Sequence, residues 1–267
     1  MPRLAANLTL LYTEHAFEDR FAAAAADGFR AVECQFPYAW PADVLAKRLQ
    51  SAGLQQVLIN APAGDWAGGE RGLAAQPGGE PRFRASLPQA IDYALALNCP
   101  RIHVLAGLAP PAASLQDIDR CWHTYRDNLA WAAQQAQAHG LSLCIEPLNT
   151  RDNPGYLLHH QAQAHDLVQA IGAPNLQVQF DAYHCQVMEG DLTVKLREGL
   201  VEGGKGRIGH IQIAGVPDRH EPDAGELNLP YLMDLIDQLG YTGWVGCEYK
   251  PRARTSEGLA GLRRWLW

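Results

Sequence analysis

This sequence lacks the features that mark membrane-spanning and secreted proteins. No stretch of about 20 apolar residues occurs, and positions 1–7 contain no apolar signal core. The six cysteines form no C-x-x-C pair, which argues against a structural zinc site and against a disulfide framework. We therefore expect a protein of the reducing cytoplasm that has no membrane partner.

Positive charge is also scarce. The chain has 22 lysines and arginines against 29 acidic residues, a net charge of −7, and its basic residues gather only in the modest run Lys250, Arg252, Arg254. Nucleic acid is therefore a poor candidate partner. A small anionic substrate is compatible with this charge, because a metal ion and a few local cations can dominate a pocket. The sequence sets no oligomeric state, and a homo-oligomer is compatible with it.

Two common catalytic fingerprints are missing. The glycines at 203, 204 and 206 precede a predicted strand, which is the wrong order for a helix start that binds phosphate. We therefore find no dinucleotide fingerprint for hydride transfer, and no G-x-S-x-G motif of a nucleophilic serine occurs.

What the sequence does contain is an alternation of short apolar runs and helical segments, about eight times over 267 residues. Strict alternation implies parallel strands with right-handed crossovers, and eight units favour a closed (β/α)₈ barrel, the TIM barrel, over an open sheet. We expect one α/β barrel domain over residues 1–267. The predicted strands are 4–8, 30–33, 56–60, 101–105, 141–146, 176–181, 207–213 and 244–249.

Segments rich in alanine and leucine with helical spacing lie between these strands. The glycine-rich segment 185–206 has the weakest helical pattern. The predicted helices are 17–26, 44–49, 83–97, 118–138, 161–171, 232–239 and 259–265.

In four of the predicted strands, a short apolar run ends on Glu146, Asp181, Gln212 or Glu248. The C-terminal strand ends form the rim where barrel enzymes do their chemistry. Side chains alternate between the two faces of a strand, and in each strand the bulky apolar residues lie opposite these four. We therefore expect the four side chains to point into the barrel. Three carboxylates and one amide oxygen would form a site suited to one divalent ion, Mg²⁺ or Mn²⁺.

Other polar residues are expected near the same rim. His184 follows Asp181 by three positions, on what we predict to be a loop above the metal, and His103 on the fourth strand would face the same cavity. Either histidine could instead be a satisfied core or loop residue. Weaker candidates for lining the pocket end the third, second and first strands: Asn60, Glu33 and Asn7.

A long loop follows the third strand, over residues 60–80, on the catalytic side of the barrel. A segment of this length inside a compact domain is often a lid. Trp66 would supply an apolar cover and Arg71 a cation. The alternative is a plain surface loop.

Two glutamates on opposite walls beside an oxygen-bound metal suit proton transfer between neighbouring carbons. A metal can polarise an α-hydroxy-carbonyl compound and stabilise its enediolate. One of Glu146 and Glu248 would take a proton from carbon, and the other would return one to the neighbouring carbon or shuttle the hydroxyl proton. This favours aldose–ketose type isomerisation, or epimerisation beside a ketone.

The chain also carries long and specific motifs: RLAANL at 3–8, PAGDW at 62–66, GERG at 69–72, IEP at 145–147, HIQIA at 210–214, RHEP at 219–222, GE at 225–226 and GCEYKP at 246–251. In these it resembles the hydroxypyruvate isomerase family, within the xylose-isomerase-like barrel superfamily, over essentially its whole length. The resemblance implies a (β/α)₈ barrel and a divalent metal on Glu146, Asp181, Gln212 and Glu248. It also implies that Glu146 and Glu248 are the proton donor and acceptor.

Two branches of this family resemble the chain. One converts hydroxypyruvate to tartronate semialdehyde, and Trp66 and Arg71 look like that branch, which we take as the first expectation. The alternative branch interconverts 2-oxo- and 3-oxo-tetronates, and residues 93–99 and 214–222 look like that one.

Both substrates are small sugar acids that carry a carboxylate. Arg71, Lys250 and Arg219 are the candidate partners for it, and each could instead be a solvated surface charge.

Three other functions compete with isomerisation. Sugar 3-epimerases share the barrel and the pair of glutamates, but the position of Gln212 is usually histidine in that group. A barrel endonuclease would need several metals, more histidine ligands and a basic face, which a net charge of −7 disfavours. A non-catalytic sugar-acid binding protein would not require two inward glutamates.

Overall fold

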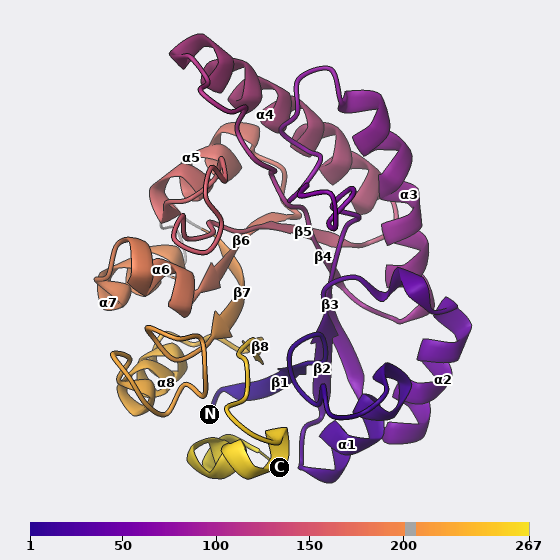
Figure 1. The fold of residues 1–267 in the computed structure, drawn as a ribbon, viewed down its shortest axis with the longest axis vertical. Coiled ribbons are helices and arrows are strands. Elements are labelled where there is room, and N and C mark those ends of the chain that lie inside the picture. The colour runs from indigo at the N-terminus through magenta and orange to yellow at the C-terminus, as the bar shows by residue number, and fades with distance from the viewer. Residues whose placement is uncertain (201–206, 267) are drawn as a thin grey trace.

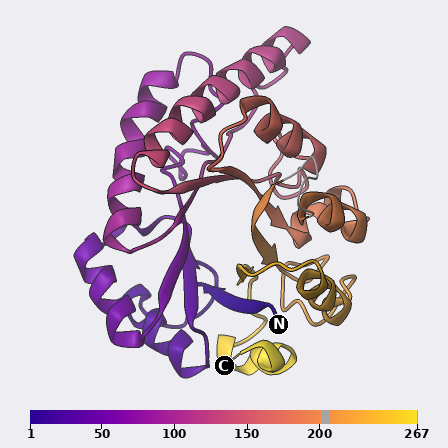
Figure 2. The same cartoon turned by 180° about the vertical axis from the view of Figure 1, so that it is seen from behind.

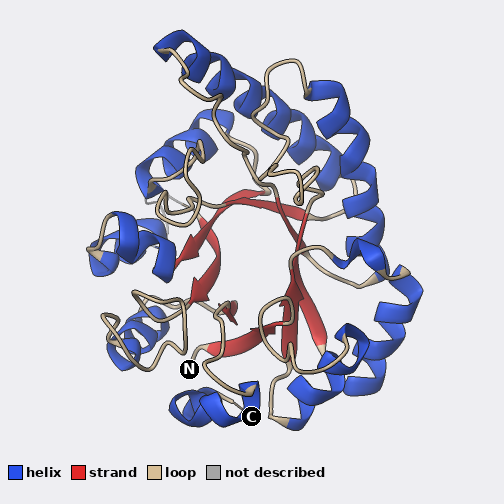
Figure 3. Ribbon diagram, viewed as in Figure 1, coloured by secondary structure: helices blue, strands red, loops and turns tan. Residues whose placement is uncertain are grey.

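Eight parallel strands close into a barrel, and helices surround it, as predicted (Figures 1 and 3). In this computed structural model, which describes residues 1–200 and 207–266, each strand pairs with the next and the last pairs back with the first. The strands are β1 (Arg3–Asn7), β2 (Ala31–Cys34), β3 (Gln55–Asn60), β4 (Arg101–His103), β5 (Ser142–Ile145), β6 (Leu176–Asp181), β7 (Ile208–Ile213) and β8 (Trp244–Cys247). Each of them overlaps the strand predicted at its place.

Helices cover the outside of the barrel. The weakest predicted segment, 185–206, supplies most of one helix and the whole of the next; its residues 201–206, with the three glycines, lie outside the described part of the chain. The helices are η1 (Phe17–Asp19), α1 (Arg20–Ala26), η2 (Pro37–Ala39), α2 (Ala42–Ala52), α3 (Glu80–Ala96), α4 (Leu115–Gln137), α5 (Gln161–Ile171), α6 (Ala182–Met188), α7 (Leu192–Leu200) and α8 (Leu229–Gln238), where η denotes a 3₁₀ helix.

The last predicted helix differs in type, because η3 (Thr255–Trp265) is a 3₁₀ helix. Two glycines inside it let its backbone approach the loop that follows β7. A Cβ atom at Gly258 would lie 2.6 Å from a carboxylate oxygen of Glu221, and one at Gly261 would lie 2.1 Å from Asp223. Glycine has a low propensity for the α-helix. The two glycines and their close contacts therefore account for a 3₁₀ helix where the spacing of apolar residues predicted an ordinary helix.

The apolar side chains of the strands face the helices, as their alternation predicted. In β5, Leu143 and Ile145 belong to the main hydrophobic core, whereas Cys144 between them is buried but lies outside that core. In β6, Val178 and Phe180 belong to the same core. The polar residues that alternate with them therefore point into the barrel.

The loop between β3 and α3 contains the predicted lid, whose tip is open to solvent. Residues 65–69 are exposed, and Trp66 is 44% exposed. Residues 73–75 at the base are buried, and Gly72 forms an antiparallel bridge with Ala106. The base is thus fixed to the loop after β4, while movement of the tip stays a prediction.

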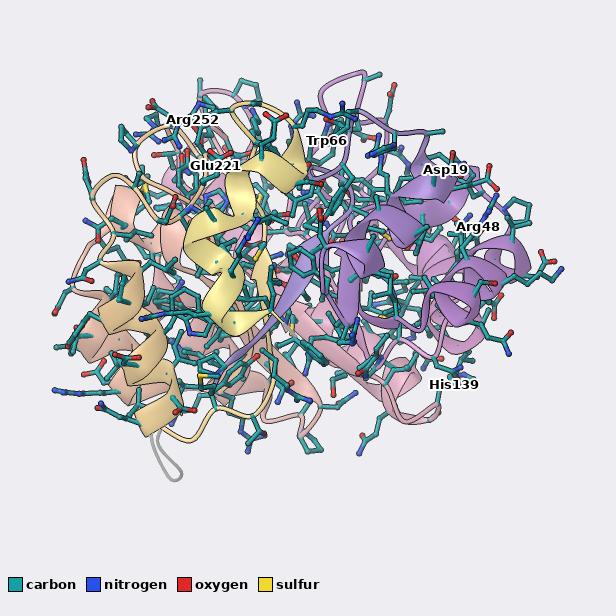
Figure 4. All side chains as sticks on the ribbon, turned by 90° about the horizontal axis from the view of Figure 1, so that it is seen from below. Asp19, Arg48, Trp66, His139, Glu221 and Arg252 are labelled. Carbon is teal, nitrogen blue, oxygen red and sulfur yellow. The ribbon has the colours of Figure 1, made fainter. Side chains whose placement is uncertain are left out.

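The side view in Figure 4 separates the two ends of the barrel. Trp66, Glu221 and Arg252, which follow β3, β7 and β8, lie along its upper edge, and His139, which precedes β5, lies at the lower edge. The upper edge is therefore the C-terminal end of the strands. Figure 2 shows the same barrel from behind, again with the helices on its outside. Among the described helices, none has the length and apolar character that a membrane span requires.

Candidate active site

Four side chains predicted to point inward gather at the C-terminal end of β5 to β8. Glu146 and Glu248 directly follow β5 and β8, Asp181 ends β6, and Gln212 lies in β7 as the pairing partner of Asp181. All four are buried, from 0% exposed for Asp181 to 5% for Glu248. Strand alternation thus brings three carboxylates and one amide into a place shielded from water.

Two carboxylate oxygens of this cluster have no hydrogen-bond partner among the described residues. They are Oε1 of Glu146 and Oδ2 of Asp181. Carboxylate oxygens of Glu146 and Asp181 lie within 4.8 Å of each other and of a ring nitrogen of His184. Buried polar atoms are seldom left unpaired, and carboxylate oxygens are the donors that Mg²⁺ and Mn²⁺ prefer. The cluster therefore fits a divalent cation.

A guanidinium from the chain itself also contacts this cluster. Nη2 of Arg219 lies 2.7 Å from Oε2 of Glu248 and 3.6 Å from Oδ2 of Asp181. On its other oxygen, Glu248 accepts hydrogen bonds from Gln35 at 2.7 Å and from Asn7 at 3.0 Å. The Glu248 carboxylate is therefore held in one orientation.

The three carboxyl groups have raised pKa values. Burial, followed by the charges of Glu248 and Asp181, raises the pKa of Glu146 well above its usual range. Burial raises the pKa of Glu248 to about 7 and that of Asp181 to about 6, although the charge of Arg219 opposes both shifts. Carboxyl groups with such pKa values can accept and release protons near neutral pH.

His184 is placed to donate a hydrogen bond rather than to bind a metal. Its Nδ1 accepts from the backbone N–H of Asn149 at 3.0 Å, and burial, followed by the charge of Arg219, lowers its pKa well below the usual range. A neutral imidazole whose Nδ1 is an acceptor carries its proton on Nε2, which here lies 3.7 Å from Oδ2 of Asp181.

The prediction that His184 lies on a loop was wrong, because it lies in helix α6. Asp181 starts this helix by accepting a hydrogen bond from the N–H of Tyr183 at 2.7 Å. The aspartate at the strand end is thus also an N-cap, which brings the histidine back over the cluster within one helical turn.

His103 and Asn60 lie on the neighbouring strands β4 and β3, where they are pairing partners. Nδ1 of His103 lies 3.6 Å from Oε2 of Glu146, and burial lowers the pKa of His103 to about 3, so the ring is neutral. Asn60 is buried, and its backbone carbonyl accepts a hydrogen bond from the hydroxyl of Tyr38. The structure therefore brings His103 to the carboxylates, whereas Asn60 lies one strand further away.

A cavity of about 600 Å³ lies beside the cluster, to which it is connected by Arg219, the partner of Glu248 and Asp181. Four of the predicted substrate-binding residues line it: Trp66, Arg71, Arg219 and Lys250. The guanidinium carbon of Arg71 lies 4.2 Å from the ring centroid of Trp66, and its nitrogen donates to the backbone carbonyls of Trp66 and Glu70. Within the described part of the chain, neither Arg71 nor Lys250 forms an ion pair, whereas Arg219 pairs with carboxylates of the cluster. Two charges on this cavity thus have no acidic partner there.

Sequence reasoning missed Arg151 and Tyr183, which line the same cavity. Arg151 donates to the Tyr183 hydroxyl at 2.8 Å and to the carbonyl of Pro217 at 2.7 Å, and this hydroxyl donates to Asp152 at 2.6 Å. The guanidinium carbons of Arg151 and Arg219 lie 5.8 Å and 5.1 Å from the Tyr183 ring centroid. The available signal was their position just after β5 and β6, on the catalytic rim.

Comparison with known proteins gives one consistent family. The sequence model of the family described as xylose isomerase-like TIM barrel matches residues 21–265. The chain is 57% identical over 266 residues to 2-oxo-tetronate isomerase of Cupriavidus necator, a match that covers 100% of this chain and 99% of the relative. It is 43% identical over 266 residues to hydroxypyruvate isomerase of Escherichia coli, with 100% and 98% covered.

Solved structures agree with this result. The structure described as AP endonuclease, family 2, from Brucella melitensis has a TM-score of 0.95 and 46% sequence identity, over 100% of both chains. The chain therefore belongs to the xylose isomerase-like TIM barrel family and, within it, to the group of hydroxypyruvate and 2-oxo-tetronate isomerases.

Proposed function

We propose that this isomerase is metal-dependent and moves a carbonyl group between neighbouring carbons of a small 2-oxo-3-hydroxy acid. The observation that carries the proposal is the buried cluster of Glu146, Asp181, Gln212 and Glu248, in which two carboxylate oxygens have no hydrogen-bond partner among the described residues. A cavity lined by Arg71, Arg151, Arg219 and Lys250 lies beside this cluster, and these cations suit an anionic substrate.

Glu146, Asp181, Gln212 and Glu248 would hold one Mg²⁺ or Mn²⁺ through oxygen atoms. When bound, the ion would stabilise the negative charge that develops on the substrate oxygens as the carbon–hydrogen bond breaks. Oxygen ligands accept either ion, so the choice between the two depends on availability as well as on the site.

Glu146 and Glu248 act as the proton donor and acceptor. One of them takes the proton from C3 of the substrate, and the other protonates the resulting 2,3-enediolate at C2, while the proton of the 3-hydroxyl passes to O2. Their raised pKa values support this role. Because β6 and β7 separate β5 from β8, the two carboxylates reach the substrate from different walls.

Neighbouring residues would bind and orient the substrate. His184 would donate from Nε2 to a substrate oxygen, and His103 would contact the substrate beside Glu146. Arg71 and Lys250, which have no ion-pair partner within the described chain, would bind the carboxylate, with Arg219 beside the reacting carbons.

The tip of the loop after β3 would act as a lid. Trp66 lines the cavity and is still 44% exposed, so closure would bury its ring over the substrate. Exclusion of water protects an enediolate from side reactions. Asn60, which does not line the cavity, would act at most through its neighbours on β4.

Of the two substrates that the relatives' names suggest, we favour 2-oxo-tetronate, with hydroxypyruvate as the alternative. The relative named for 2-oxo-tetronate is 57% identical, and the one named for hydroxypyruvate is 43% identical. The two acids share the reacting unit, and 2-oxo-tetronate has one additional hydroxymethyl group, for which a cavity of about 600 Å³ has room.

Proton NMR in D₂O tests the proposal. Metal-loaded and chelator-stripped protein would each be incubated with 2-oxo-tetronate and, separately, with hydroxypyruvate. We expect conversion only with metal, entry of solvent deuterium at C2 of the product, and faster conversion of 2-oxo-tetronate. Equal rates with and without metal would overturn the metal dependence. Metal binding without turnover of either acid would instead favour a sugar 3-epimerase or a binding protein.

A further inference from the structure

The Glu33 carboxylate lies inside the barrel below the candidate metal site and joins three strands. The side chain comes from β2 and is 0% exposed. Its Oε1 accepts hydrogen bonds from Asn7 of β1 at 3.0 Å and from Gln212 of β7 at 2.6 Å. Its Oε2 lies 2.7 Å from Nε2 of His210, also on β7.

The fourth strand that this carboxylate contacts, β8, leaves space for it. A Cβ atom at Gly246 would lie 2.5 Å from both carboxylate oxygens of Glu33. Any other residue at this position would push the carboxylate away. Gly246 stands two positions before Glu248 and therefore on the same face of the strand.

Glu33 determines which end of the Gln212 side chain faces the candidate metal site. A carboxylate can only accept hydrogen bonds, whereas an amide has one donor end and one acceptor end. Because Nε2 of Gln212 donates to Glu33, its Oε1 points away, and there it accepts from Gln179 at 2.6 Å. Gln179 occupies one of the two lone pairs of this oxygen, which accepts no other hydrogen bond among the described residues, so the second lone pair is available to an ion.

The same carboxylate is linked to Glu248 through Asn7. Nδ2 of Asn7 lies 3.0 Å from Oε1 of Glu33 and 3.0 Å from Oε1 of Glu248. The other end of this amide accepts from the N–H of Thr9 at 3.0 Å, so the side chain cannot turn over without losing these contacts. Two of the four proposed ligands thus depend on one buried carboxylate.

We infer that Glu33 is a positioning residue, which holds the oxygen of Gln212 and the carboxylate of Glu248 toward the divalent cation. This inference rests on the metal site of the proposed function. It goes beyond that site because Glu33 itself would neither bind the ion nor touch the substrate.

Calorimetric titration of metal-free protein with Mn²⁺ tests the inference. Glu33→Gln should weaken Mn²⁺ binding about 10–100-fold, the usual effect of losing a group that orients a ligand. The new amide at position 33 can donate its NH₂ group to Oε1 of Gln212. The Gln212 side chain then turns over and directs its nitrogen, which cannot bind a metal, toward the ion. Glu221→Gln is the matched control: Glu221 is buried but bonds Arg252, beside which it lies in Figure 4, and Mn²⁺ affinity should not change.

A second substitution separates orientation from general damage to the barrel. In the double variant Glu33→Gln/Gln212→Glu the hydrogen bond is kept with its direction reversed, and the side chain at 212 presents oxygen at both ends. The total charge is also unchanged. We expect the double variant to recover most of the Mn²⁺ affinity that Glu33→Gln loses. Gln212→Glu alone, which adds the same carboxylate while Glu33 is present, measures the effect of the added charge, and the recovery should exceed that effect.

The outcomes distinguish a failure of the proposed metal site from a failure of the positioning role of Glu33. If the unmodified chain binds no Mn²⁺ or Mg²⁺, the proposed metal site fails. If it binds Mn²⁺ and Glu33→Gln binds it equally well, or the double variant recovers nothing, the positioning role fails. Should Glu33→Gln not fold, Gly246→Ala, which displaces the carboxylate without removing its charge, is expected to weaken Mn²⁺ binding in the same range, and unchanged affinity there would overturn the role.

Discussion

Arg219 donates a hydrogen bond of 2.7 Å from Nη2 to Oε2 of Glu248, and the same nitrogen lies 3.6 Å from Oδ2 of Asp181. A fixed positive charge of the chain therefore contacts two of the carboxylates that we assign to a divalent ion. The ion and the guanidinium must share these oxygens. Arg219 therefore opposes metal binding, although its charge stabilises the ionised form of the carboxylates.

The first prediction concerns Arg219→Met. Removal of the competing charge should tighten Mn²⁺ binding. Each 1.4 kcal/mol of repulsion between Arg219 and the ion that is removed lowers the Kd about tenfold. Turnover should nevertheless fall by about 10²-fold or more, because a positive charge beside the developing enediolate is lost. Calorimetry and steady-state kinetics measure the two effects. Weaker Mn²⁺ binding together with unchanged kcat would contradict the role given to Arg219.

The second prediction concerns the glutamate pair. Glu146→Gln and Glu248→Gln should each lower kcat by at least about 10²-fold, the usual contribution of a positioned acid or base. The double variant should be little worse than either single variant, because each turnover needs both groups. The rates come from NMR of the substrate in D₂O, measured at Mn²⁺ concentrations that saturate each variant. Multiplication of the two losses would show that the glutamates act independently.

The sequence was sufficient to place the carboxylate cluster because that placement depends on local rules. Side chains alternate along a strand, and the C-terminal ends of parallel strands meet at one rim, so Glu146, Asp181, Gln212 and Glu248 could be assigned to the same place. The apolar residues between them identify the face that packs on the helices.

Other parts of the site depend on contacts that no local pattern contains. His184 lies on a helix because Asp181 also serves as an N-cap, so one residue has two roles that spacing does not separate. The reach of Glu33 across the barrel depends on the space that Gly246 leaves on another strand. Arg151, on the loop after β5, meets Tyr183 in the first turn of α6, and the path of that loop is set by packing.

The third prediction identifies the partner of the substrate carboxylate. Arg71→Met and Lys250→Met should each raise KM with little change in kcat, because both side chains line the cavity away from the reacting carbons. We expect the larger increase, about tenfold or more, for the residue that binds the carboxylate directly, since a hydrogen bond to a charged group contributes about 1.5–3 kcal/mol.

Arg82→Met is the matched control for this test. Arg82, in the first turn of α3, pairs with Glu70, the neighbour of Arg71, but does not line the cavity. Its loss removes a nearby positive charge without removing a cavity contact. KM should stay close to that of the unmodified chain. An equal rise of KM in all three variants would show that the overall positive potential at the rim of the barrel, rather than a specific contact with the carboxylate, determines substrate binding.

The fourth prediction concerns Glu146→Gln in metal-free protein. The folded chain raises the pKa of Glu146 well above the ordinary value of 4.5, so it binds this proton more tightly than the unfolded chain does. The resulting stabilisation is complete at low pH and is lost as the pH rises from about 4.5 toward the folded pKa. An uncharged amide avoids this loss. The variant should therefore melt above the unmodified protein at pH 8, and the difference should shrink toward pH 5.

Thermal melts at pH 5 and pH 8, with and without saturating Mn²⁺, check this prediction. The buried histidines are present in both proteins. Their contribution to the pH dependence of stability therefore largely cancels in the difference between the two melting temperatures. At pH 8 without metal we expect the variant to melt at a higher temperature than the unmodified protein, because only the unmodified protein has to bury a charged carboxylate there. With Mn²⁺ the order should reverse, because the ion stabilises the folded state in proportion to its affinity and the variant lacks one charged ligand. A variant that melts lower in metal-free buffer at both pH values would show that the Glu146 carboxylate is satisfied without a cation.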